Sequence, residues 1–369
     1  MAAFDQDPRV VMTLDAGGTS FRFSAMRGNQ FVTPTVTMPS NADNLDRCLT
    51  NIIEGFTAIK QKCPAAPVAI SFAFPGPADY PNGIIGDLPN LPAFRGGIAL
   101  GPMLVEKFGV PAFINNDGDL FTYGEAIAGF LPFVNGLLEK AGSPKRYKNL
   151  FGITLGTGFG GGIVRDGELF IGDNSIAGEV WLLRNKLAPS MNAEEGACIR
   201  AVRRVYAARA GISFEQSPEP KVISEIALGA QPGDRAAAVE AFRQLGEIAG
   251  DAMGNALTLL DSLAVVGGGL SGAWPLFLPP LVAELNSTYM CPNGQKLPRL
   301  ASIAFNLQDP AQTEKFVQGE TREIRVPYSD RTLKYDPAQR IGVGISRLGT
   351  SEAIAIGAYA FALCQLENR

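Results

Sequence analysis

A run of glycines between two short apolar segments constrains the fold of this chain more than any other feature. Leu150–Leu155 has the composition of a buried strand, and Gly156–Gly162 follows it with five glycines. Ile163 and Val164 are apolar again, and Asp166-Gly167 then signals a tight hairpin turn. The glycines are therefore expected inside a β-hairpin. The Rossmann fingerprint and the P-loop instead place a helix directly after their glycines.

A second segment of the same kind lies near the N-terminus. Val10–Leu14 is an apolar strand, Asp15-Ala16-Gly17-Gly18-Thr19 is a glycine turn, and Ser20–Met26 alternates like a half-buried strand. Glycines in such turns allow an anion to approach backbone N–H groups closely. Either turn alone could simply need a positive φ angle. Two of them predict a duplicated fold that holds phosphate between its halves.

Size and charge exclude several classes of protein. A chain of 369 residues favours two domains over one. The net charge of −4 and the absence of a basic run argue against nucleic acid as a partner. No apolar run is long enough to cross a bilayer, and the N-terminus lacks the pattern of a signal peptide. Five dispersed cysteines fit a reducing cytoplasm, so the expected location is cytoplasmic.

The chain contains no histidine. Ser-His-Asp and Cys-His catalysis are therefore excluded, as is any zinc site with a histidine ligand. The spacing of the cysteines also argues against a zinc site made of cysteine alone. Proton transfer must come from carboxylate, Lys, Tyr or Cys side chains. A metal ion is expected to be a hard one bound by oxygen, such as Mg²⁺.

Helices and strands alternate along the first half, which predicts a mixed α/β sheet with helical cover. One short strand, Val110–Ile114, leads into Asn115-Asn116-Asp117-Gly118-Asp119, and a helix follows from Leu120. Polar side chains at the carboxyl end of a strand are where α/β proteins place their chemistry. The alternative is that Asp117 only caps the helix. Helices are predicted at Asn41–Gln61, Leu100–Phe108 and Leu120–Gly129.

The second half repeats this alternation and adds a third glycine segment. Ser262–Val266 is a buried strand that ends in Gly267-Gly268-Gly269, which is either a nucleotide contact or a plain βα turn. Glu179 is flanked by apolar residues and is either a paired core carboxylate or a ligand contact. The segment 293–343 is expected to be an insertion with short strands. Further helices are predicted from Glu194 to Ala210 and at Ala236–Leu259, Pro275–Leu285 and Glu352–Leu366.

Taken together, these segments resemble the ROK family of sugar kinases within the actin-like ATPase superfamily. The matching motifs, in the same order as in that family, are Asp15–Thr19, Phe74–Pro77, Pro89–Pro92, Asn116-Asp117, Leu155–Gly162, Ala177–Glu179 and Val266–Gly269. The resemblance implies an α/β fold of two actin-like (ribonuclease H-like) domains with a cleft between them. The expected domains are residues 1–134, completed by the helix 352–369, and residues 135–351, which include the insertion.

The resemblance also implies an activity and a site. The activity is ATP-dependent phosphorylation of a hexose, as in glucokinases and hexokinases, with ATP and Mg²⁺ as cofactors and a homodimer as the assembly. Asp117 is expected to be the general base, and Asp15 to hold Mg²⁺ through water. The expected sugar-binding residues are Asn90, Asn116, Asp117, Glu179 and Glu194. The expected ATP-binding residues are Asp15, Gly17, Gly18, Thr19, Gly156, Thr157, Gly158, Gly160, Gly267, Gly268 and Gly269.

Two departures from the family pattern bear on the substrate. The family has a histidine shortly after the Ala-Gly-Glu motif, whereas Leu182 stands there in this chain, and the family's cluster of one histidine and three cysteines is missing. No structural zinc is therefore expected, and the sugar must be recognised differently. Alternatives are a kinase for fructose, an N-acetyl amino sugar or a carboxylate, and a non-catalytic sugar sensor. A transcriptional repressor would need a helix-turn-helix, and only Met1–Arg9 precede the first strand.

Overall fold

Two β-sheets carry the fold, and each contains one of the predicted glycine hairpins. The structure is a computed structural model that describes residues 4–76, 78–88 and 91–368. The chain divides into two compact units. Unit 1 comprises Met1–Gly129, Gly162–Gly178 and Leu348–Arg369, and unit 2 comprises Phe130–Gly161 and Glu179–Arg347. The domain boundaries expected from the sequence stay predictions.

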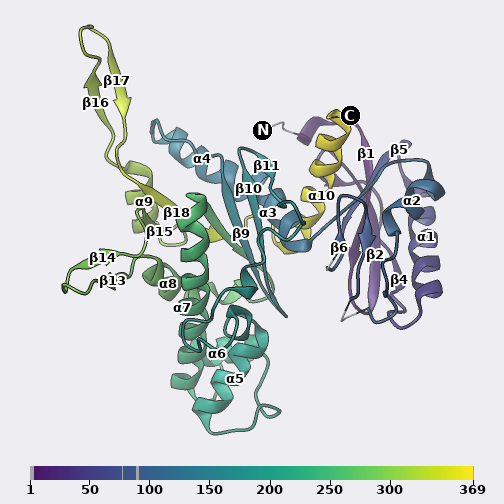
Figure 1. Cartoon of the computed structure of the whole chain (residues 1–369), viewed down its shortest axis with the longest axis horizontal. Coiled ribbons are helices and arrows are strands. Elements are labelled where there is room, and N and C mark those ends of the chain that lie inside the picture. Colours follow the sequence, from purple (N-terminus) through teal and green to yellow (C-terminus); the bar gives the residue numbers. More distant parts are fainter. Residues whose placement is uncertain (1–3, 77, 89–90, 369) are drawn as a thin grey trace. The chain divides into compact units, whose positions relative to one another are not determined.

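The sheet of unit 1 has the strand order β3-β2-β1-β5-β8, and β4 also pairs with β2. Figure 1 labels β1, β2, β4 and β5 of this sheet. β2 is antiparallel to β1, whereas β5 is parallel to both β1 and β8. The first five residues of β1 are buried, so the apolar run Val10–Leu14 becomes a central strand. The strands are β1 Val10–Ala16, β2 Ser20–Arg27, β3 Gln30–Phe31, β4 Val36–Pro39, β5 Pro67–Ala73 and β8 Ala112–Asn115, with β6 Ala78–Asp79 and β7 Ile84–Ile85 forming a separate pair.

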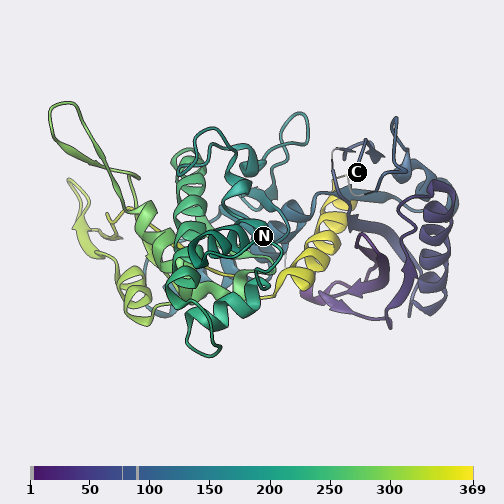
Figure 2. The ribbon, with the colours of Figure 1, turned by 90° about the horizontal axis from the view of Figure 1, so that it is seen from below.

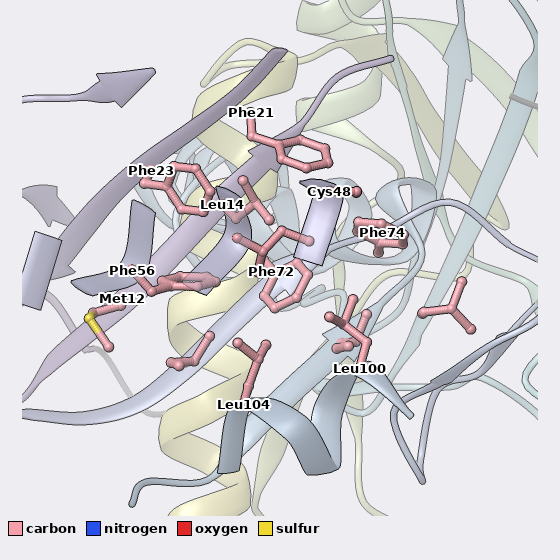
Figure 3. Packing of buried hydrophobic residues seen from close by; sticks show 14 of the residues in the cluster. Met12, Leu14, Phe21, Phe23, Cys48, Phe56, Phe72, Phe74, Leu100 and Leu104 are labelled. Carbon is pink, nitrogen blue, oxygen red and sulfur yellow. The ribbon is translucent and has the colours of Figure 1, made fainter. Parts of the chain in front are cut away.

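Two helices, α1 (Leu45–Lys62) and α2 (Leu100–Phe108), bury apolar faces in the core of unit 1. α1 begins where Asn44 accepts a hydrogen bond from the N–H of Arg47. Figure 3 shows aromatic rings of the sheet and of α1 packed together. The rings of Phe23 and Phe56 are edge-to-face, with centroids 5.1 Å apart. Burial of such large apolar side chains is the main favourable contribution to folding here.

The helices α3 (Asp117–Ile127) and α10 (Thr350–Glu367) pack against each other, and α10 also packs against β1 and β5 (Figure 2). Glycines make this close contact possible. A Cβ on Gly124 would overlap the carbonyl oxygen of Ala353, and a Cβ on Gly357 would overlap that of Leu120. Unit 1 therefore depends on a helix from the far end of the chain.

The second sheet has the order β11-β10-β9-β12-β18-β15, and β9, β12, β18 and β15 are parallel neighbours. Like the first sheet, it begins with hairpin strands and continues with parallel ones, so the expected mixed α/β duplication is confirmed. Asp166 and Gly167 form the predicted two-residue turn, both with positive φ angles, 51° and 86°. The strands are β9 Leu150–Leu155, β10 Phe159–Arg165, β11 Glu168–Leu169, β12 Leu263–Gly267, β15 Ile303–Asn306 and β18 Arg340–Ile345.

The predicted helices are present, with three shifted starts. α1 begins at Leu45 rather than Asn41, α3 begins at Asp117 rather than Leu120, and α5 begins at Ile199 because Ala193–Glu195 forms a separate 3-10 turn. Among the described residues, no helix has the length and apolar character needed to cross a membrane. The remaining helices are α4 Phe130–Lys140, α5 Ile199–Ala210, α6 Pro220–Ala227, α7 Arg235–Leu260, α8 Trp274–Leu285 and α9 Pro310–Gln318, with 3-10 turns η1 Phe4–Gln6, η2 Val180–Leu182, η3 Ala193–Glu195 and η4 Ser271–Ala273.

The segment 293–343, expected to be an insertion, supplies β15 and part of β18 to the second sheet. Only part of it can therefore be an insertion. The rest includes α9 and the hairpin of β16 (Arg322–Arg325) and β17 (Thr332–Tyr335). A second small hairpin, β13 (Thr288–Met290) with β14 (Lys296–Pro298), begins just before the segment.

Candidate active site

The first glycine turn is held by its own backbone and by Ser40. The N–H of Gly17 donates to the carbonyl of Ser20 at 3.1 Å, and the hydroxyl of Ser40 donates to the carbonyl of Gly18 at 2.6 Å. The N–H of Ser40 also donates to the carbonyl of Thr19, at 3.1 Å. These contacts fix the turn while leaving Gly18 and Thr19 exposed. Sequence reasoning missed Ser40, because nothing local marks a serine just beyond the neighbouring strand.

Three parallel strand ends bring the acidic residues of unit 1 to one edge of its sheet. Asp15 of β1 lies beside Ala73 of β5, and Ala73 lies beside Asn115 of β8. Neighbouring strands are about 4.8 Å apart, so Asp15 and Asn115 lie roughly 10 Å from each other. Asp117 follows two residues later. The expected Mg²⁺ ligand and the expected base therefore share one sheet edge.

The structure assigns the helix cap to Asn116 rather than Asp117. Asn116 has extended backbone angles, and its Oδ1 accepts a hydrogen bond from the N–H of Gly118 at 2.8 Å. Asp117 is already the first helical residue, and its Oδ1 accepts from the same N–H at 2.8 Å. Capping alone therefore does not account for Asp117.

Asp117 is exposed as a residue, although the surrounding protein desolvates its carboxyl. Burial raises its pKa above the usual value, and the hydrogen bond from Gly118 opposes this rise. Because its pKa is raised, the ionised carboxylate of Asp117 is a stronger proton acceptor than that of an ordinary aspartate.

The second and third glycine segments lie together in unit 2, at the ends of the neighbouring parallel strands β9 and β12. The N–H of Leu270 donates to the carbonyl of Leu155 at 2.9 Å. Gly268 has a φ angle of 90°, and a Cβ there would overlap the backbone of Leu155. The N–H of Ile199 donates to the carbonyl of Gly156 at 2.8 Å, which ties the second turn to α5.

Glu194 contacts the second glycine turn directly. Its Oε2 accepts a hydrogen bond from the N–H of Phe159 at 3.0 Å, and a Cβ on Gly158 would lie 2.7 Å from the same oxygen. Its Oε1 accepts from Arg200 at 3.2 Å. Arg200 in turn donates to the carbonyl of Thr157 at 3.0 Å. Glu194 and Arg200 therefore brace the turn from the side of η3 and α5.

Sequence reasoning missed Arg200, although the chain carries a signal for it. A cation in the first turn of a helix faces the positive end of the helix dipole, which is unfavourable by itself. Arg200 is the second residue of α5, and both Glu194 and Glu195 pair with it. An arginine at such a position, shortly after two glutamates, indicates a local ion pair.

Of the two remaining expected sugar-binding residues, Glu179 and Asn90, the structure describes only Glu179. Glu179 is half-buried, precedes η2 and accepts a hydrogen bond from the indole N–H of Trp181. η2 packs against η3, the turn that carries Glu194, and the N–H of Ala193 donates to the carbonyl of Leu183 at 2.7 Å. Asn90 lies outside the described residues.

The glycines show where a ligand fits. Gly17, Gly160, Gly162 and Gly268 are required by the fold, because a Cβ at each would meet nearby atoms. By contrast, a Cβ on Gly18 or Gly269 would have no neighbour within 4 Å, and one on Gly156 would only touch the N–H of Gly269, at 3.9 Å. Neither Gly18 nor Gly269 has a positive φ angle. These two open, exposed glycines fit a phosphate that approaches the backbone.

The described residues include no group of three or more Cys, Asp or Glu side chains placed to bind a metal ion. Asp15 is exposed near the end of β1, two residues before Gly17. A single exposed carboxylate near a glycine turn suits Mg²⁺, which usually keeps several waters and is bound through one or two carboxylates and the phosphates of a substrate.

Residues 11–304 match the family model described as "ROK family". In structure, the chain is similar to a glucokinase from Parabacteroides distasonis ATCC 8503. The two are 54% identical with a TM-score of 0.90, and the match covers 98% of this chain and 99% of that one. A ROK family glucokinase from Streptomyces griseus, solved in complex with glucose and AMPPNP, has the same fold at a TM-score of 0.59 and 20% identity, over 95% of this chain and 98% of its own.

Curated relatives carry the names of two kinds of sugar kinase. A glucokinase from Thermotoga maritima is 25% identical over 283 residues, which are 73% of this chain and 84% of that relative. An N-acetyl-D-glucosamine kinase from Photobacterium profundum is 28% identical over 290 residues, which are 73% of this chain and 88% of that relative.

Proposed function

The chain belongs to the ROK family as a glucokinase-like, ATP-dependent sugar kinase, and from that premise we propose that it transfers a phosphoryl group from ATP to a hexose with Asp117 as general base. The observation that carries the assignment of the base is the position of Asp117. Asp117 closely follows the strand end that shares a sheet edge with Asp15, it is exposed as a residue, and the cap of α3 is supplied by Asn116.

In the proposed reaction, Asp117 accepts the proton of one sugar hydroxyl while that oxygen forms a bond to the terminal phosphorus of ATP. The bond between that phosphorus and the oxygen of ADP breaks, so the products are ADP, a hexose phosphate and a protonated Asp117, which returns its proton to water. Such transfers need little covalent help and depend on positioning and on stabilisation of charge. A carboxylate with a raised pKa suits this role, because it accepts a proton more readily than an ordinary aspartate.

The three glycine segments are the proposed phosphate and nucleotide contacts. Gly17, Gly18 and Thr19 belong to the first turn, Gly156, Thr157, Gly158 and Gly160 to the second, and Gly267, Gly268 and Gly269 to the third. Gly18 and Gly269 contribute by lacking a side chain, whereas Gly160 and Gly268 act by holding the shape of their turns. Asp15 would hold Mg²⁺, which supplies positive charge to the phosphates when bound.

The proposed sugar contacts are Asn90, Asn116, Glu179 and Glu194, together with Asp117. Glu194 is already engaged with Phe159 and Arg200, so its contribution to sugar binding would come through the shape of the second turn as well as through its own oxygens. The remaining proposals are a homodimer, a cytoplasmic location where ATP is available, and a protein without structural zinc.

A panel of sugars in an assay that couples ADP release to a spectroscopic signal tests the function. We expect glucose to give the highest kcat/KM, with phosphorylation dependent on Mg²⁺. ADP release that is no faster with any sugar than with water alone would contradict the catalytic proposal and favour a sugar-sensing protein.

N-acetyl-D-glucosamine is the second candidate substrate. A relative named as a kinase for this sugar, from Vibrio vulnificus, is 30% identical over 276 residues, which are 70% of this chain and 83% of that relative. A kcat/KM for N-acetyl-D-glucosamine at least about tenfold above that for glucose, which corresponds to about 1.4 kcal/mol of transition-state binding, would make the amino sugar the substrate.

A further inference from the structure

The hairpin of β16 and β17 stands apart from the core of its unit. All eight residues of its two strands are exposed, and Figure 1 shows it extending away from α9 and β18. An isolated two-stranded hairpin is marginally stable in water. In the described part of the chain, β16 and β17 pair only with each other, so both outer edges present backbone groups for strand addition.

The hairpin has one apolar and one charged face. Ile324 lies opposite Leu333, and Arg322 lies opposite Tyr335 with its guanidinium over the tyrosine ring at 5.8 Å. Ile324, Leu333 and Tyr335 are 39%, 46% and 44% exposed, so this apolar face meets water. The opposite face carries Glu323, Arg325, Thr332 and Lys334. Arg325 already pairs with Asp330 at 2.7 Å within the hairpin, so a partner would cover apolar surface and add a second carboxylate near this arginine.

The register of the hairpin identifies which backbone groups point outward from β16. The N–H of Val326 donates to the carbonyl of Arg331 at 2.9 Å, so this pair is hydrogen-bonded within the hairpin. Hydrogen-bonded and non-hydrogen-bonded pairs alternate along antiparallel strands, so Ile324 also points its backbone groups toward β17. The N–H and carbonyl groups of Glu323 and Arg325 therefore point away from β17, toward a neighbouring strand.

We propose that β16 pairs with β16 of a second copy of this chain, forming a four-stranded antiparallel sheet across a two-fold axis at Ile324. In this register, Ile324 faces Ile324 of the partner subunit. Glu323 faces Arg325 of the partner subunit, and Arg325 faces Glu323 of the partner subunit. Both ion pairs fall on the residues whose backbone groups point outward, and the apolar faces of the two hairpins become continuous.

Charge complementarity favours this register and this partner. Centring the axis on Glu323 or on Arg325 would place two like charges opposite each other, which is destabilising. The outer edge of β17, centred on Leu333, would place Thr332 opposite Lys334 twice and form no ion pair. A strand that is complementary to itself in this way fits a second copy of the chain. The inference specifies the interface of the proposed homodimer and does not depend on the catalytic roles.

A charge-reversal series on the full chain tests the interface, with sedimentation velocity at several concentrations as the measurement. The wild type should be a dimer. Glu323→Arg should weaken it at least about tenfold, because the introduced arginine would then face Arg325 of the partner subunit. The double variant Glu323→Arg/Arg325→Glu should regain most of the affinity. Both variants place an arginine opposite Lys334 within the hairpin. The double variant also loses the ion pair of Arg325 with Asp330, 2.7 Å long in the wild type, so Arg325→Glu alone is measured beside it as the control for that loss.

Lys296→Glu, on the exposed β14, changes charge by the same amount with the opposite sign and should leave the dimer intact. A wild type that stays monomeric at about 100 μM would overturn the proposal, because a dimer assembles by mass action as the concentration of chains rises. An unchanged dimer in Glu323→Arg, or a double variant that dimerises no better than Glu323→Arg and Arg325→Glu do singly, would overturn it as well. Kinase activity per chain, measured in parallel, separates this result from a failure of the proposed function.

Discussion

At the scale of single residues, the glycines of the turns fall into two groups with different consequences. Gly17, Gly160 and Gly268 are glycine because the fold leaves no room for a Cβ, so substitutions there report on folding. Gly18 and Gly269 have open space and no positive φ angle, so their own fold does not require them to be glycine. Substitutions at these two positions report on what approaches from outside.

Gly18→Ala and Gly269→Ala should each weaken ATP binding while preserving the fold. The added methyl group occupies the side from which a phosphate would reach the backbone N–H groups. We expect Kd for ATP to rise at least about tenfold, or about 1.4 kcal/mol, by titration calorimetry. Gly136→Ala in α4, which also has no neighbour within 4 Å, is the matched control and should leave Kd unchanged. Normal ATP affinity in both variants would contradict the phosphate role.

Gly158 is a poorer place for this test. A valine there should weaken nucleotide binding, but its Cβ would also displace the carboxylate of Glu194 from the N–H of Phe159. A loss of ATP affinity in Gly158→Val could therefore come from a lost phosphate contact or from a broken hydrogen bond between Glu194 and Phe159.

Asp117→Asn should lower kcat by roughly 10²- to 10⁴-fold, because the amide keeps the shape but cannot accept a proton. The affinities for sugar and ATP should change much less. The folded-state pKa of Asp117 is raised, so its ionisation costs the folded state free energy above that pKa. The asparagine variant should therefore melt at the same temperature or slightly higher. Near-normal turnover on the best sugar would remove Asp117 from the mechanism.

The pH dependence of kcat/KM should also report the ionisation of Asp117. The reaction needs the ionised carboxylate, so the rate should fall as pH decreases through the pKa of Asp117. Because burial raises that pKa, the acid limb should lie above the ordinary aspartate value of about 3.9. The residual activity of Asp117→Asn should lack this limb. An acid limb at or below the ordinary value in the wild type would argue against Asp117 as the titrating base.

At the scale of elements, the contact of α3 with α10 decides the stability of unit 1. Gly124→Ala should lower the melting temperature, even though alanine favours helices over glycine by about 1 kcal/mol. Its Cβ would overlap the carbonyl of Ala353, and forcing such helices apart costs about 1–3 kcal/mol or more. Gly136→Ala in the open part of α4 should instead raise the melting temperature slightly. A Gly124→Ala variant as stable as the wild type would show that α10 is not packed as described.

Most helices and strands could be predicted because the sequence patterns that specify them involve residues only a few positions apart. The Asp166-Gly167 turn, the apolar strand Val10–Leu14 and the amphipathic helix α1 all follow from residues a few positions apart. By contrast, β15 and β18 are short strands whose partners lie far away in the sequence, so no local pattern separates them from an insertion. Ser40 was missed for the same reason, since its role depends on a contact with the distant backbone of Gly18. Arg200 has a local signal in Glu194 and Glu195, but its contact with the distant carbonyl of Thr157 does not follow from that signal.

At the scale of the whole molecule, the two sheets repeat one arrangement, with hairpin strands first and parallel strands after. In both, the candidate site residues lie at or just after the carboxyl ends of the parallel strands: Asp15 and Asp117 in the first sheet, Gly156 and Gly269 in the second. Two glycine turns in the sequence were enough to predict the repeat. Which sugar binds could not be predicted, because recognition depends on residues from several segments, and Asn90 is among them.

The last prediction concerns metal in the intact protein. Without histidine, and with five cysteines that are dispersed and free, the chain offers no zinc cluster among its described residues. We therefore expect elemental analysis to find far less than one Zn per chain, and the zinc chelator 1,10-phenanthroline to leave the melting temperature unchanged. Removal of Mg²⁺ with EDTA should abolish phosphorylation and leave the melting temperature of the ligand-free protein unaltered, because Mg²⁺ would bind with ATP rather than hold the fold. One tightly bound Zn per chain, or a large drop in melting temperature after zinc chelation, would show that oxygen and sulfur ligands from separate segments assemble a structural site after all.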